Sequence, residues 1–323
     1  MNRIKRIAVF TSGGDAPGMN AAVRAVVRTA LNYKLEVYGI NRGYQGMISG
    51  EFVKLTSKSV RGIIQRGGTI LRTARSEEFR TKEGRKKAND NLVKFKIDAV
   101  VVIGGDGSFM GAGIFSQEHN IPFVGIPGTI DNDMYGTDYT IGFDTALNTV
   151  TEAIDKIKDT ALSHDRTFFV EVMGRDAGFI ALKAGIATGA EMVLIPEISG
   201  QEEKLKIILA NTDKKSNIII VAEGNKMGGA EDVAKKYGKK YKSRGVRVNV
   251  LGHMQRGGSP TAFDRYLASR MGVEAVDALM DNLRSIMIGY SNHKVVHVSF
   301  NKTNKNKRGI GEELIRVNEI LAK

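Results

Sequence analysis

Short apolar runs alternate with amphipathic stretches along most of this chain. Runs rich in β-branched residues predict buried strands at 6–10, 35–40, 98–103, 122–126, 167–172, 191–195, 217–222 and 246–251. Amphipathic stretches between them predict helices that include 19–32, 143–159, 201–211 and 260–280. Because strands that alternate with helices are typical of parallel sheets, we predict an α/β fold with mainly parallel sheets flanked by helices.

The length of the chain indicates two such units. At 323 residues it exceeds the size at which one hydrophobic core usually stops growing, about 250–300 residues. We expect the chain to leave the first lobe near residue 139 and to return near residue 251. The predicted lobes are therefore a larger one, 1–138 plus 251–323, and a smaller one, 139–250.

Composition limits the classes of protein to which this chain can belong. Hydrophobic residues make up 42% of the chain and charged residues 26%, as in ordinary globular proteins. The absence of cysteine excludes disulfides, thiolate catalysis and cysteine-ligated zinc. Only four apolar residues in a row precede Thr11, too few for a signal-peptide core, and no apolar run approaches the ~18 residues of a membrane span. We expect a soluble, cytoplasmic protein.

The net charge of +13 raises the possibility of a nucleic-acid partner. The basic residues are spread along the chain, however, and their densest cluster, "NKTNKNKRG" (301–309), is typical of a solvated surface. Aromatic residues are sparse and are not interleaved with the basic ones, which argues against a platform for stacked bases. Small phosphorylated ligands suit the charge equally well.

Three of the predicted strands end in glycine plus aspartate, in "TSGGDAPGMN" (11–20), "GGDGS" (104–108) and "PGTIDND" (127–133). In open α/β sheets ligands bind outside the carboxyl ends of the strands, so these loops are expected at one edge. Glycines let backbone amides approach an anion, and the helix that follows each loop favours phosphate at its N-terminus. "GGDGS" alone is also common turn chemistry. Neither a Walker A sequence nor GxGxxG follows the first strand.

The aspartates of these loops suit phosphoryl transfer. Asp106, between glycines at a strand end, suits magnesium, which prefers one or two carboxylates beside substrate phosphates. Asp131 can take the proton of an acceptor hydroxyl, and Asp133 can hold a metal-bound water or orient the loop. For Asp138 we favour the simpler role of capping a turn.

Arginines supply the positive charge that a phosphate needs, because the planar guanidinium forks onto phosphate oxygens. They occur in "RTAR" (72–75), "SHDR" (163–166), "VMGRDAG" (172–178) and "GHMQRGGSP" (252–260). A single arginine of this kind is usually an ordinary surface residue. Packing explains poorly why His253 and Arg256 lie three apart in a glycine-rich loop, so that loop is predicted to bind a ligand.

Together, "TSGGDAPGMNA", "GGDGS", "PGTIDND", "VMGRDAG" and "LGHMQRGGSP" closely resemble, in this order and spacing, the ATP-dependent 6-phosphofructokinases of the bacterial type. The resemblance covers nearly the whole chain. It implies two Rossmann-like lobes with the active site in the cleft between them, assembled as a homotetramer. It also implies a glycolytic kinase that transfers the γ-phosphoryl group of ATP, with Mg²⁺, to the 1-hydroxyl of fructose 6-phosphate. The products are fructose 1,6-bisphosphate and ADP.

The resemblance also implies residue roles. The catalytic residues are Asp131 as the base, Thr129, Arg175 and Arg75. The metal ligand is Asp106. The ATP-binding residues are Gly14, Tyr44 beside the adenine, Arg75, Ser76, Gly105, Asp106, Gly107 and Ser108. The sugar-phosphate residues are Thr129, Asp131, Met173, Gly174, Arg175, Glu223, His253 and Arg256, with Arg166 and Arg247 reaching in from a neighbouring subunit.

A separate site for an ADP or phosphoenolpyruvate effector is also implied. Its matching residues are Arg24, Arg28, Lys158, Gly189, Glu191, Lys214 and Lys215. Several positions depart from the family pattern. Ser57 and Lys158 occur where arginines are expected, Thr212 where a lysine is expected, and Gly62 where an aspartate is expected. Lys58 lies beside the first of these. Near the nucleotide, Arg72 and Thr73 replace glycine and serine.

Three alternatives remain, and the first two share part of these motifs. The pyrophosphate-dependent phosphofructokinases are expected to carry "GGDDS" and "PKTIDND" in these two loops. This chain has Gly107 in place of the second aspartate and Gly128 in place of the lysine. Lipid and NAD kinases also carry Gly-Gly-Asp-Gly, but not "TIDND" or "GHMQRGGS". A nucleic-acid-binding protein rests on net charge alone and predicts affinity that falls steeply with salt.

Overall fold

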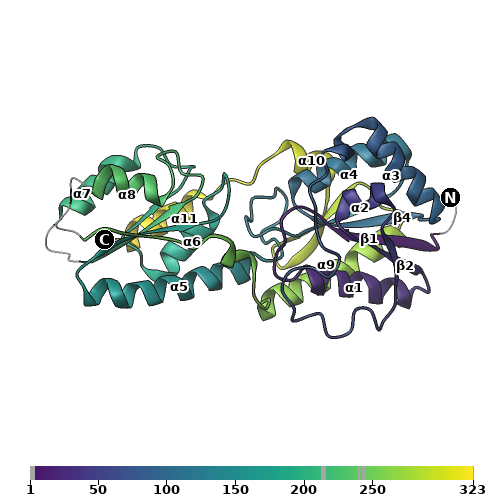
Figure 1. Ribbon diagram of the computed structural model, residues 1–323, viewed down its shortest axis with the longest axis horizontal. Coiled ribbons are helices and arrows are strands. Elements are labelled where there is room, and N and C mark those ends of the chain that lie inside the picture. Colours follow the sequence, from purple (N-terminus) through teal and green to yellow (C-terminus); the bar gives the residue numbers. More distant parts are fainter. Residues whose placement is uncertain (1–3, 212–215, 239–240, 242–244, 323) are drawn as a thin grey trace. The chain divides into compact units, whose positions relative to one another are not determined.

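The strands form two separate sheets, one of seven strands and one of four, within residues 4–211, 216–238, 241 and 245–322 that the computed structural model describes. Each sheet belongs to its own compact unit (Figure 1). The first unit comprises Met1–Ile130, Met134–Thr145 and Arg256–Arg308, and the second comprises Asp131–Asp133, Ala146–Gln255 and Gly309–Lys323. The predicted α/β class with mostly parallel sheets flanked by helices is confirmed.

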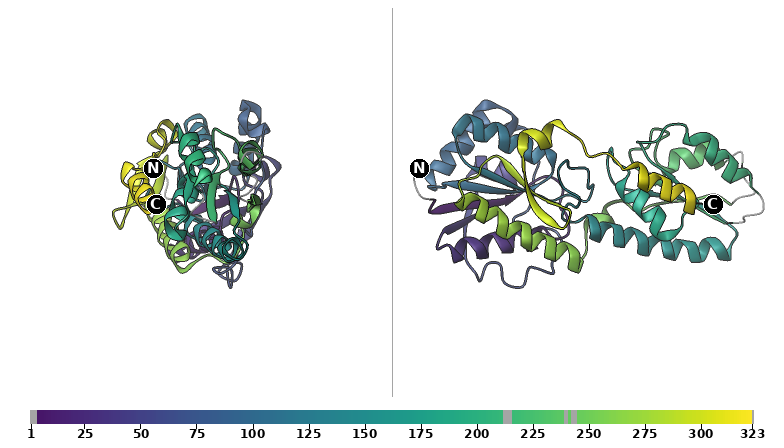
Figure 2. Two further views of the ribbon diagram at one scale, coloured as in Figure 1. Left: turned by 90° about the vertical axis from the view of Figure 1, so that its left-hand side faces the viewer. Right: turned by 180° about the vertical axis from the view of Figure 1, so that it is seen from behind.

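The bounds of the units differ from those of the predicted lobes in four places, at 131–133, 139–145, 251–255 and 309–323. Residues 139–145 group with the first unit, because Ile141 forms a parallel bridge with Gly128 there. The C-terminal helix α11 (Glu312–Leu321) groups with the second unit, because it packs against α6 (Phe179–Thr188), as the yellow helix of Figure 2 shows.

The sheet of the first unit has the order β11-β10-β5-β4-β1-β2-β3. Its strands are β1 (Arg6–Thr11), β2 (Glu36–Ile40), β3 (Phe52–Leu55), β4 (Ala99–Gly104), β5 (Phe123–Pro127), β10 (Ile286–Ser291) and β11 (Lys294–Ser299). The edge strands β3 and β11 are antiparallel to their neighbours and the other pairings are parallel. All six residues of β4 are buried, because helices cover both faces of a central parallel strand.

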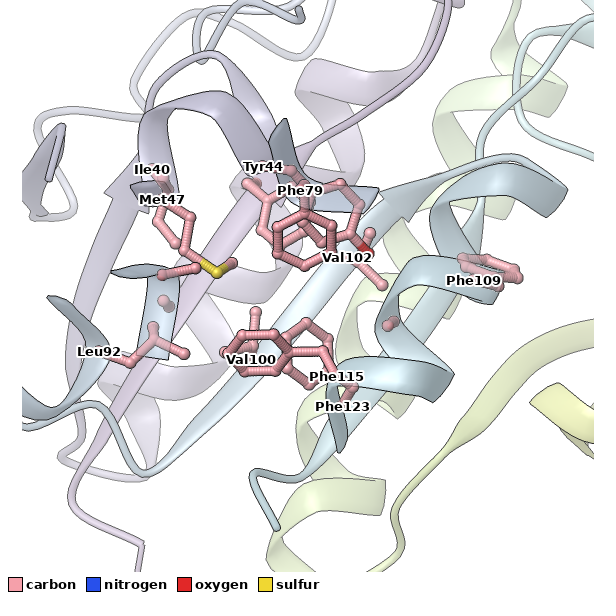
Figure 3. Close-up of a cluster of buried hydrophobic side chains, with 14 of the residues drawn as sticks. Ile40, Tyr44, Met47, Phe79, Leu92, Val100, Val102, Phe109, Phe115 and Phe123 are labelled. Atoms are coloured by element: carbon pink, nitrogen blue, oxygen red, sulfur yellow. The ribbon is translucent and has the colours of Figure 1, made fainter. Parts of the chain in front are cut away.

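Helices cover both faces of this sheet (Figure 1). On one face lie α2 (Gly43–Ser49), α3 (Lys82–Lys94), α4 (Asp106–His119), α10 (Phe300–Lys305) and the short 3₁₀ helix η1 (Glu78–Arg80). The other face carries α1 (Met19–Asn32) and α9 (Ala262–Met280), which pack against each other. Figure 3 shows the core between the sheet and the first group, where phenylalanine side chains from η1, α4 and β5 meet.

The second unit has a wholly parallel sheet of order β7-β8-β6-β9. Its strands are β6 (Thr167–Val172), β7 (Met192–Leu194), β8 (Asn217–Ala222) and β9 (Arg247–Val250). Leucines and valines of α7 (Gln201–Ala210) and α8 (Ala230–Gly238) form the core on one face. Helix α5 (Phe143–Ser163) lies on the opposite face (Figure 1), and the 3₁₀ helix η3 (Gly252–Arg256) follows β9.

All eight predicted strands are present, but the sequence reading missed β3, β10 and β11. β3 is a four-residue edge strand that contains Lys54, so its apolar signal is weak. β10 and β11 form a hairpin whose two turn residues, Asn292 and His293, both have positive φ. Such a turn is usually signalled by Asn-Gly, and the His in place of Gly hides it.

Candidate active site

The three glycine-rich loops leave neighbouring strands at one edge of the seven-stranded sheet. β1, β4 and β5 are adjacent, and their last residues are in register, with Thr11 opposite Ile103 and Gly104 opposite Pro127. Hydrogen bonds continue past the strand ends, from Ser12 N to the Ile103 carbonyl (2.9 Å) and from Gly128 N to the Gly104 carbonyl (3.0 Å). The predicted convergence of the loops is therefore confirmed.

The β4 loop leads directly into α4. Asp106 is the first residue of this helix, and no side chain caps it at Gly105, so the positive end of the helix dipole favours an anion at this terminus. A Cβ at Gly104 would lie 2.5 Å from Ser108 Oγ and 2.7 Å from the Ser12 carbonyl oxygen, so only glycine fits there. Gly107 differs, because it is exposed and a Cβ there would meet no protein atom within 4 Å.

Tyr44 contacts the first turn of α4 from the hydrophobic core. Its ring is buried, stacks on Phe79 at 3.9 Å between ring centroids, and lies in the core drawn in Figure 3. The phenol donates a hydrogen bond to the Ser108 carbonyl (2.5 Å), and burial raises the pKa of that phenol. The contact of Tyr44 with adenine stays a prediction, whereas its support of the first turn of α4 is visible.

The loop that carries Arg75 is tied to β1. Thr11 Oγ1 donates to the Arg72 carbonyl (3.0 Å), and Arg72 has a positive φ of 58°. Ser76 Oγ donates to Gln45 Oε1 (2.9 Å), while Arg75 is exposed.

The charge of Arg72 also acts on Glu51. A hydrogen bond from Arg42 is the main reason that the pKa of Glu51 is lowered, and the charge of Arg72 adds a smaller contribution.

Gly14 and Arg256 come together in the first unit. A Cβ at Gly14 would collide with the Arg256 guanidinium, so the glycine of the first loop makes room for that arginine. The structure thus brings a predicted ATP-binding position next to a predicted sugar-phosphate position. These residues are more than 240 positions apart in the sequence.

The β5 loop carries Thr129 and Asp131. The Thr129 backbone is fixed by two hydrogen bonds, from its N–H to the Ile141 carbonyl (3.1 Å) and from Thr140 Oγ1 to its carbonyl (2.7 Å). Asp131 is only 3% exposed, and its Oδ2 lies 3.4 Å from Nε of Arg175. Asp138 accepts a hydrogen bond from Asn292 N (3.0 Å), which is the turn role expected for it.

In the second unit, Glu223 and Gln255 fix the loop after β6. Glu223 Oε1 accepts hydrogen bonds from Gly174 N (3.2 Å) and Arg175 N (2.7 Å), and Gln255 Oε1 accepts one from Met173 N (3.1 Å). Because β6 lies between β8 and β9, these groups all come from the same edge of the sheet. The sequence reading missed Gln255, which lies between His253 and Arg256 and is fully buried.

Arg166 and Arg247 lie at the opposite edge of that sheet. Arg166 immediately precedes β6, and Arg247 is the first residue of β9, so both stand at the amino ends of parallel strands. The loop with Met173 follows the carboxyl end of β6. Within the second unit, the structure therefore does not bring these two arginines together with Met173, Gly174 and Arg175.

The effector candidates divide between the units. Arg24 and Arg28 are one turn apart on α1, and the pKa of Arg24 is lowered first by burial and then by the charge of Arg28. In the second unit, Lys158 Nζ donates to the Thr188 carbonyl beside Gly189, and Glu191 Oε2 accepts from Ile218 N (2.5 Å). Lys214, Lys215 and Thr212 lie outside the described residues.

Among the described residues, no group of three or more His, Asp or Glu side chains is arranged to hold a metal ion. The magnesium ligand predicted from the sequence is thus a single protein carboxylate, Asp106. Within the same part of the chain, no helix is long and apolar enough to cross a membrane.

Comparisons with known proteins agree on one family. A family model described as Phosphofructokinase matches residues 6–279. The chain is 54% identical to ATP-dependent 6-phosphofructokinase 2 of Bacteroides thetaiotaomicron, over 98% of each chain. It is 53% identical to ATP-dependent 6-phosphofructokinase 1 of Thermus thermophilus, over 99% of this chain and 100% of that one.

Solved structures show the same fold. A phosphofructokinase from Saccharomyces cerevisiae superposes with a TM-score of 0.89 at 40% identity, covering 98% of this chain but only 48% of the yeast chain. A pyrophosphate-dependent phosphofructokinase from Marinobacter aquaeolei gives a TM-score of 0.85 at 22% identity, over 99% of this chain and 92% of that one. At that identity the second similarity concerns the fold alone.

Proposed function

The chain belongs to the phosphofructokinase family, and we propose that it phosphorylates the 1-hydroxyl of fructose 6-phosphate with the γ-phosphoryl group of ATP. It is an ATP-dependent 6-phosphofructokinase, a phosphotransferase. The observation that carries the assignment of roles is the register of β1, β4 and β5, which gathers three glycine-rich loops at one edge. The glycolytic role and the cytoplasmic location are proposals that rest on the family.

The first unit binds ATP in this proposal. The phosphates lie over the first turn of α4, where Gly104 and Gly107 keep side chains away and the helix N-terminus favours an anion. Gly14, Arg75 and Ser76 complete the contacts of the nucleotide. Tyr44 stabilises the first turn of α4 through its hydrogen bond to the Ser108 carbonyl.

Magnesium fits this site as an ion held by Asp106 together with phosphate oxygens. A single carboxylate beside a phosphate site is enough to hold Mg²⁺, because water molecules and substrate phosphates usually supply the other ligands of this ion. When bound, Mg²⁺ would neutralise charge on the phosphates. Asp133 is a candidate for holding a metal-bound water.

Asp131 and other residues of the second unit bind and activate the sugar phosphate. Asp131 takes the proton of the acceptor hydroxyl, and Arg175, 3.4 Å from it, stabilises charge on the transferred group. Glu223 holds the backbone that presents Arg175. The remaining candidates of this chain are Thr129, Met173, Gly174, His253 and Arg256.

Arg166 and Arg247 serve the site of a neighbouring subunit in a homotetramer. This proposal is supported by the position of both arginines at the amino ends of β6 and β9, whereas the Met173 loop follows the carboxyl end of β6. We therefore give them no role in the site of their own chain. Guanidinium groups supplied across a subunit boundary can still fork onto the sugar phosphate.

ATP is favoured over pyrophosphate as the donor at two positions. Gly107 leaves open space at the start of α4, where an aspartate would crowd and repel a nucleotide phosphate. At Gly128 a Cβ would lie 3.1 Å from both Ile103 Cγ2 and Met19 Cε, so the lysine of the pyrophosphate-dependent pattern would be crowded there.

A coupled assay with fructose 6-phosphate tests the donor. We expect formation of the bisphosphate with ATP and Mg²⁺, and a rate at least about 10²-fold lower with pyrophosphate, because a missing lysine contact and the rest of the pocket both disfavour the smaller donor. Comparable rates with the two donors would contradict the assignment. Addition of excess EDTA should abolish the ATP reaction if Mg²⁺ is required.

The effector response is expected to be weak or altered. Charge-assisted bonds to an anion contribute about 1.5–3 kcal/mol each, whereas allosteric coupling usually amounts to ~1–3 kcal/mol in total. Ser57 and Thr212 replace basic residues, and Lys158 is engaged with the Thr188 carbonyl. Fructose 6-phosphate saturation curves with ADP or phosphoenolpyruvate should shift by less than about twofold. A several-fold shift at millimolar concentration or below would show a working effector site.

A further inference from the structure

Asp264 is a charged side chain in the interior of the first unit. It is the third residue of α9 and is fully buried. Burial raises the pKa of its carboxyl to about 6, with hydrogen bonds from Thr145 and Gly142 acting in the opposite direction. Because a buried carboxylate is costly unless it is well paired, its partners indicate what it does.

The partners of Asp264 all lie on one short segment outside its own helix. Oδ1 accepts from Gly142 N (2.9 Å), and Oδ2 accepts from Thr145 N (2.8 Å) and Thr145 Oγ1 (2.5 Å). Its own helix is capped by Thr261, whose Oγ1 accepts from Asp264 N (3.2 Å). The carboxylate therefore serves residues 142–145, where α5 begins, rather than α9.

The two residues before that segment, 140–141, pair with the β5 loop. Ile141 N donates to the Pro127 carbonyl (2.9 Å), Thr129 N donates to the Ile141 carbonyl (3.1 Å), and Thr140 Oγ1 donates to the Thr129 carbonyl (2.7 Å). Both backbone groups of Thr129 are thus held by residues 140–141. Asp131 follows two residues later in the chain.

The segment has little room to shift. Gly142 has φ of 102°, and a Cβ there would lie 2.6 Å from the Ala16 side chain. A Cβ at Gly18 would lie 2.6 Å from Ile141 Cγ2 and 3.6 Å from Asp264 Cβ. Residues 141–142 are therefore packed closely between the first glycine-rich loop and Asp264.

We propose that Asp264 is a positioning residue for phosphoryl transfer: by fixing Gly142 and Thr145 it sets the backbone at Thr129 from which Asp131 projects. The inference rests on the proposed role of Asp131 as the base. It goes beyond helix capping, because a cap alone would influence stability without changing how efficiently Asp131 works.

Asp264→Asn is the variant that tests it. The amide has one oxygen in place of two, so its NH₂ group must face one of the backbone N–H donors of Gly142 or Thr145, and the segment shifts. Misplacement by about 1 Å can cost ~10²-fold in rate, so we expect kcat to fall by about 10- to 100-fold. KM for ATP should change by less than about threefold, because Gly105 to Ser108 make none of these contacts.

Glu118→Gln is the matched control. It makes the same chemical change in the Arg85–Glu118 ion pair, at the far end of α4 from Asp106. We expect it to lower the melting temperature and leave kcat within about twofold of wild type. If Asp264→Asn does not fold, Thr145→Val removes the hydroxyl that donates to Asp264 Oδ2 and accepts from Thr261 N (3.0 Å). It should give a smaller fall in kcat with the same unchanged KM for ATP.

A double-mutant cycle with Asp131→Asn decides between positioning and simple destabilisation. If Asp264 acts through Asp131, adding Asp264→Asn to Asp131→Asn should lower the kcat of folded enzyme by less than about twofold further. A further 10- to 100-fold fall, or an unchanged kcat in the single Asp264→Asn variant, would overturn the proposal. A nearly active Asp131→Asn enzyme would instead refute the proposed base, so the two failures are distinguishable.

Discussion

Replacing Asp131 by asparagine is expected to lower kcat by about 10²–10⁴-fold, the usual contribution of a general base. Asparagine preserves the size of the side chain and can keep its polar contacts, so KM for fructose 6-phosphate should change only modestly. The side chain is 3% exposed and lies 3.4 Å from Arg175, which leaves little water nearby to take over the proton. Steady-state kinetics in a coupled assay measure both constants.

Asp138→Asn is the matched control for that experiment. It makes the same substitution in the same loop, but at a residue that accepts a hydrogen bond from Asn292 N, and an asparagine oxygen can accept this bond as well. We expect wild-type kcat from this variant. An Asp131→Asn enzyme that retains more than about a tenth of wild-type kcat would exclude general-base catalysis by Asp131.

The three glycine-rich loops could be predicted from the sequence because each is marked by a short local pattern. A glycine next to an aspartate at the end of an apolar run identifies the carboxyl end of a buried strand, and parallel pairing brings such ends to one edge. The register of Gly104 with Pro127 follows from that rule. The hairpin of β10 and β11 was missed because its Asn292-His293 turn lacks the expected glycine.

The supporting residues were beyond a reading of local patterns. Gln255 is one polar residue in the short 3₁₀ helix η3, and Asp264 is one in the first turn of α9, where polar residues are common turn or capping chemistry. Their importance comes from partners far away in sequence, Met173 for the one and Gly142 for the other. Burial separates them from ordinary surface residues, and burial of a single polar side chain cannot be read from spacing.

Tyr44 shows how a resemblance can place a residue without giving its contacts. The family pattern implies that its ring flanks the adenine, whereas the described structure stacks the ring on Phe79 and uses the hydroxyl on Ser108. The two roles differ in what a Tyr44→Phe change would remove. The phenylalanine variant keeps the ring and loses only the bond to the first turn of α4.

Gly107 is the position at which the choice of donor is most open to change. It is the second residue of α4, it is exposed, and a Cβ there meets no protein atom within 4 Å. Its φ is not in the left-handed region, so the backbone accepts a side chain without strain. An aspartate in the first turn of a helix is also favourable for the helix itself. The fold therefore does not require glycine at this position, and any loss of function on substitution comes from the ligand.

Gly107→Asp is accordingly expected to lower kcat/KM for ATP by about 10²–10³-fold while the melting temperature stays at or slightly above that of wild type. Two like charges about 4 Å apart repel by roughly 4 kcal/mol at an effective dielectric constant of 20, and a tenfold effect needs about 1.4 kcal/mol. Gly107→Asn fills the same space without the charge, so it should lose about tenfold or less. Binding of fructose 6-phosphate, followed separately by calorimetry, should be nearly unchanged in both. Equal losses for ATP and for the sugar phosphate would mean that the loop is distorted, and equal losses in the two variants would mean that space, not charge, excludes the nucleotide.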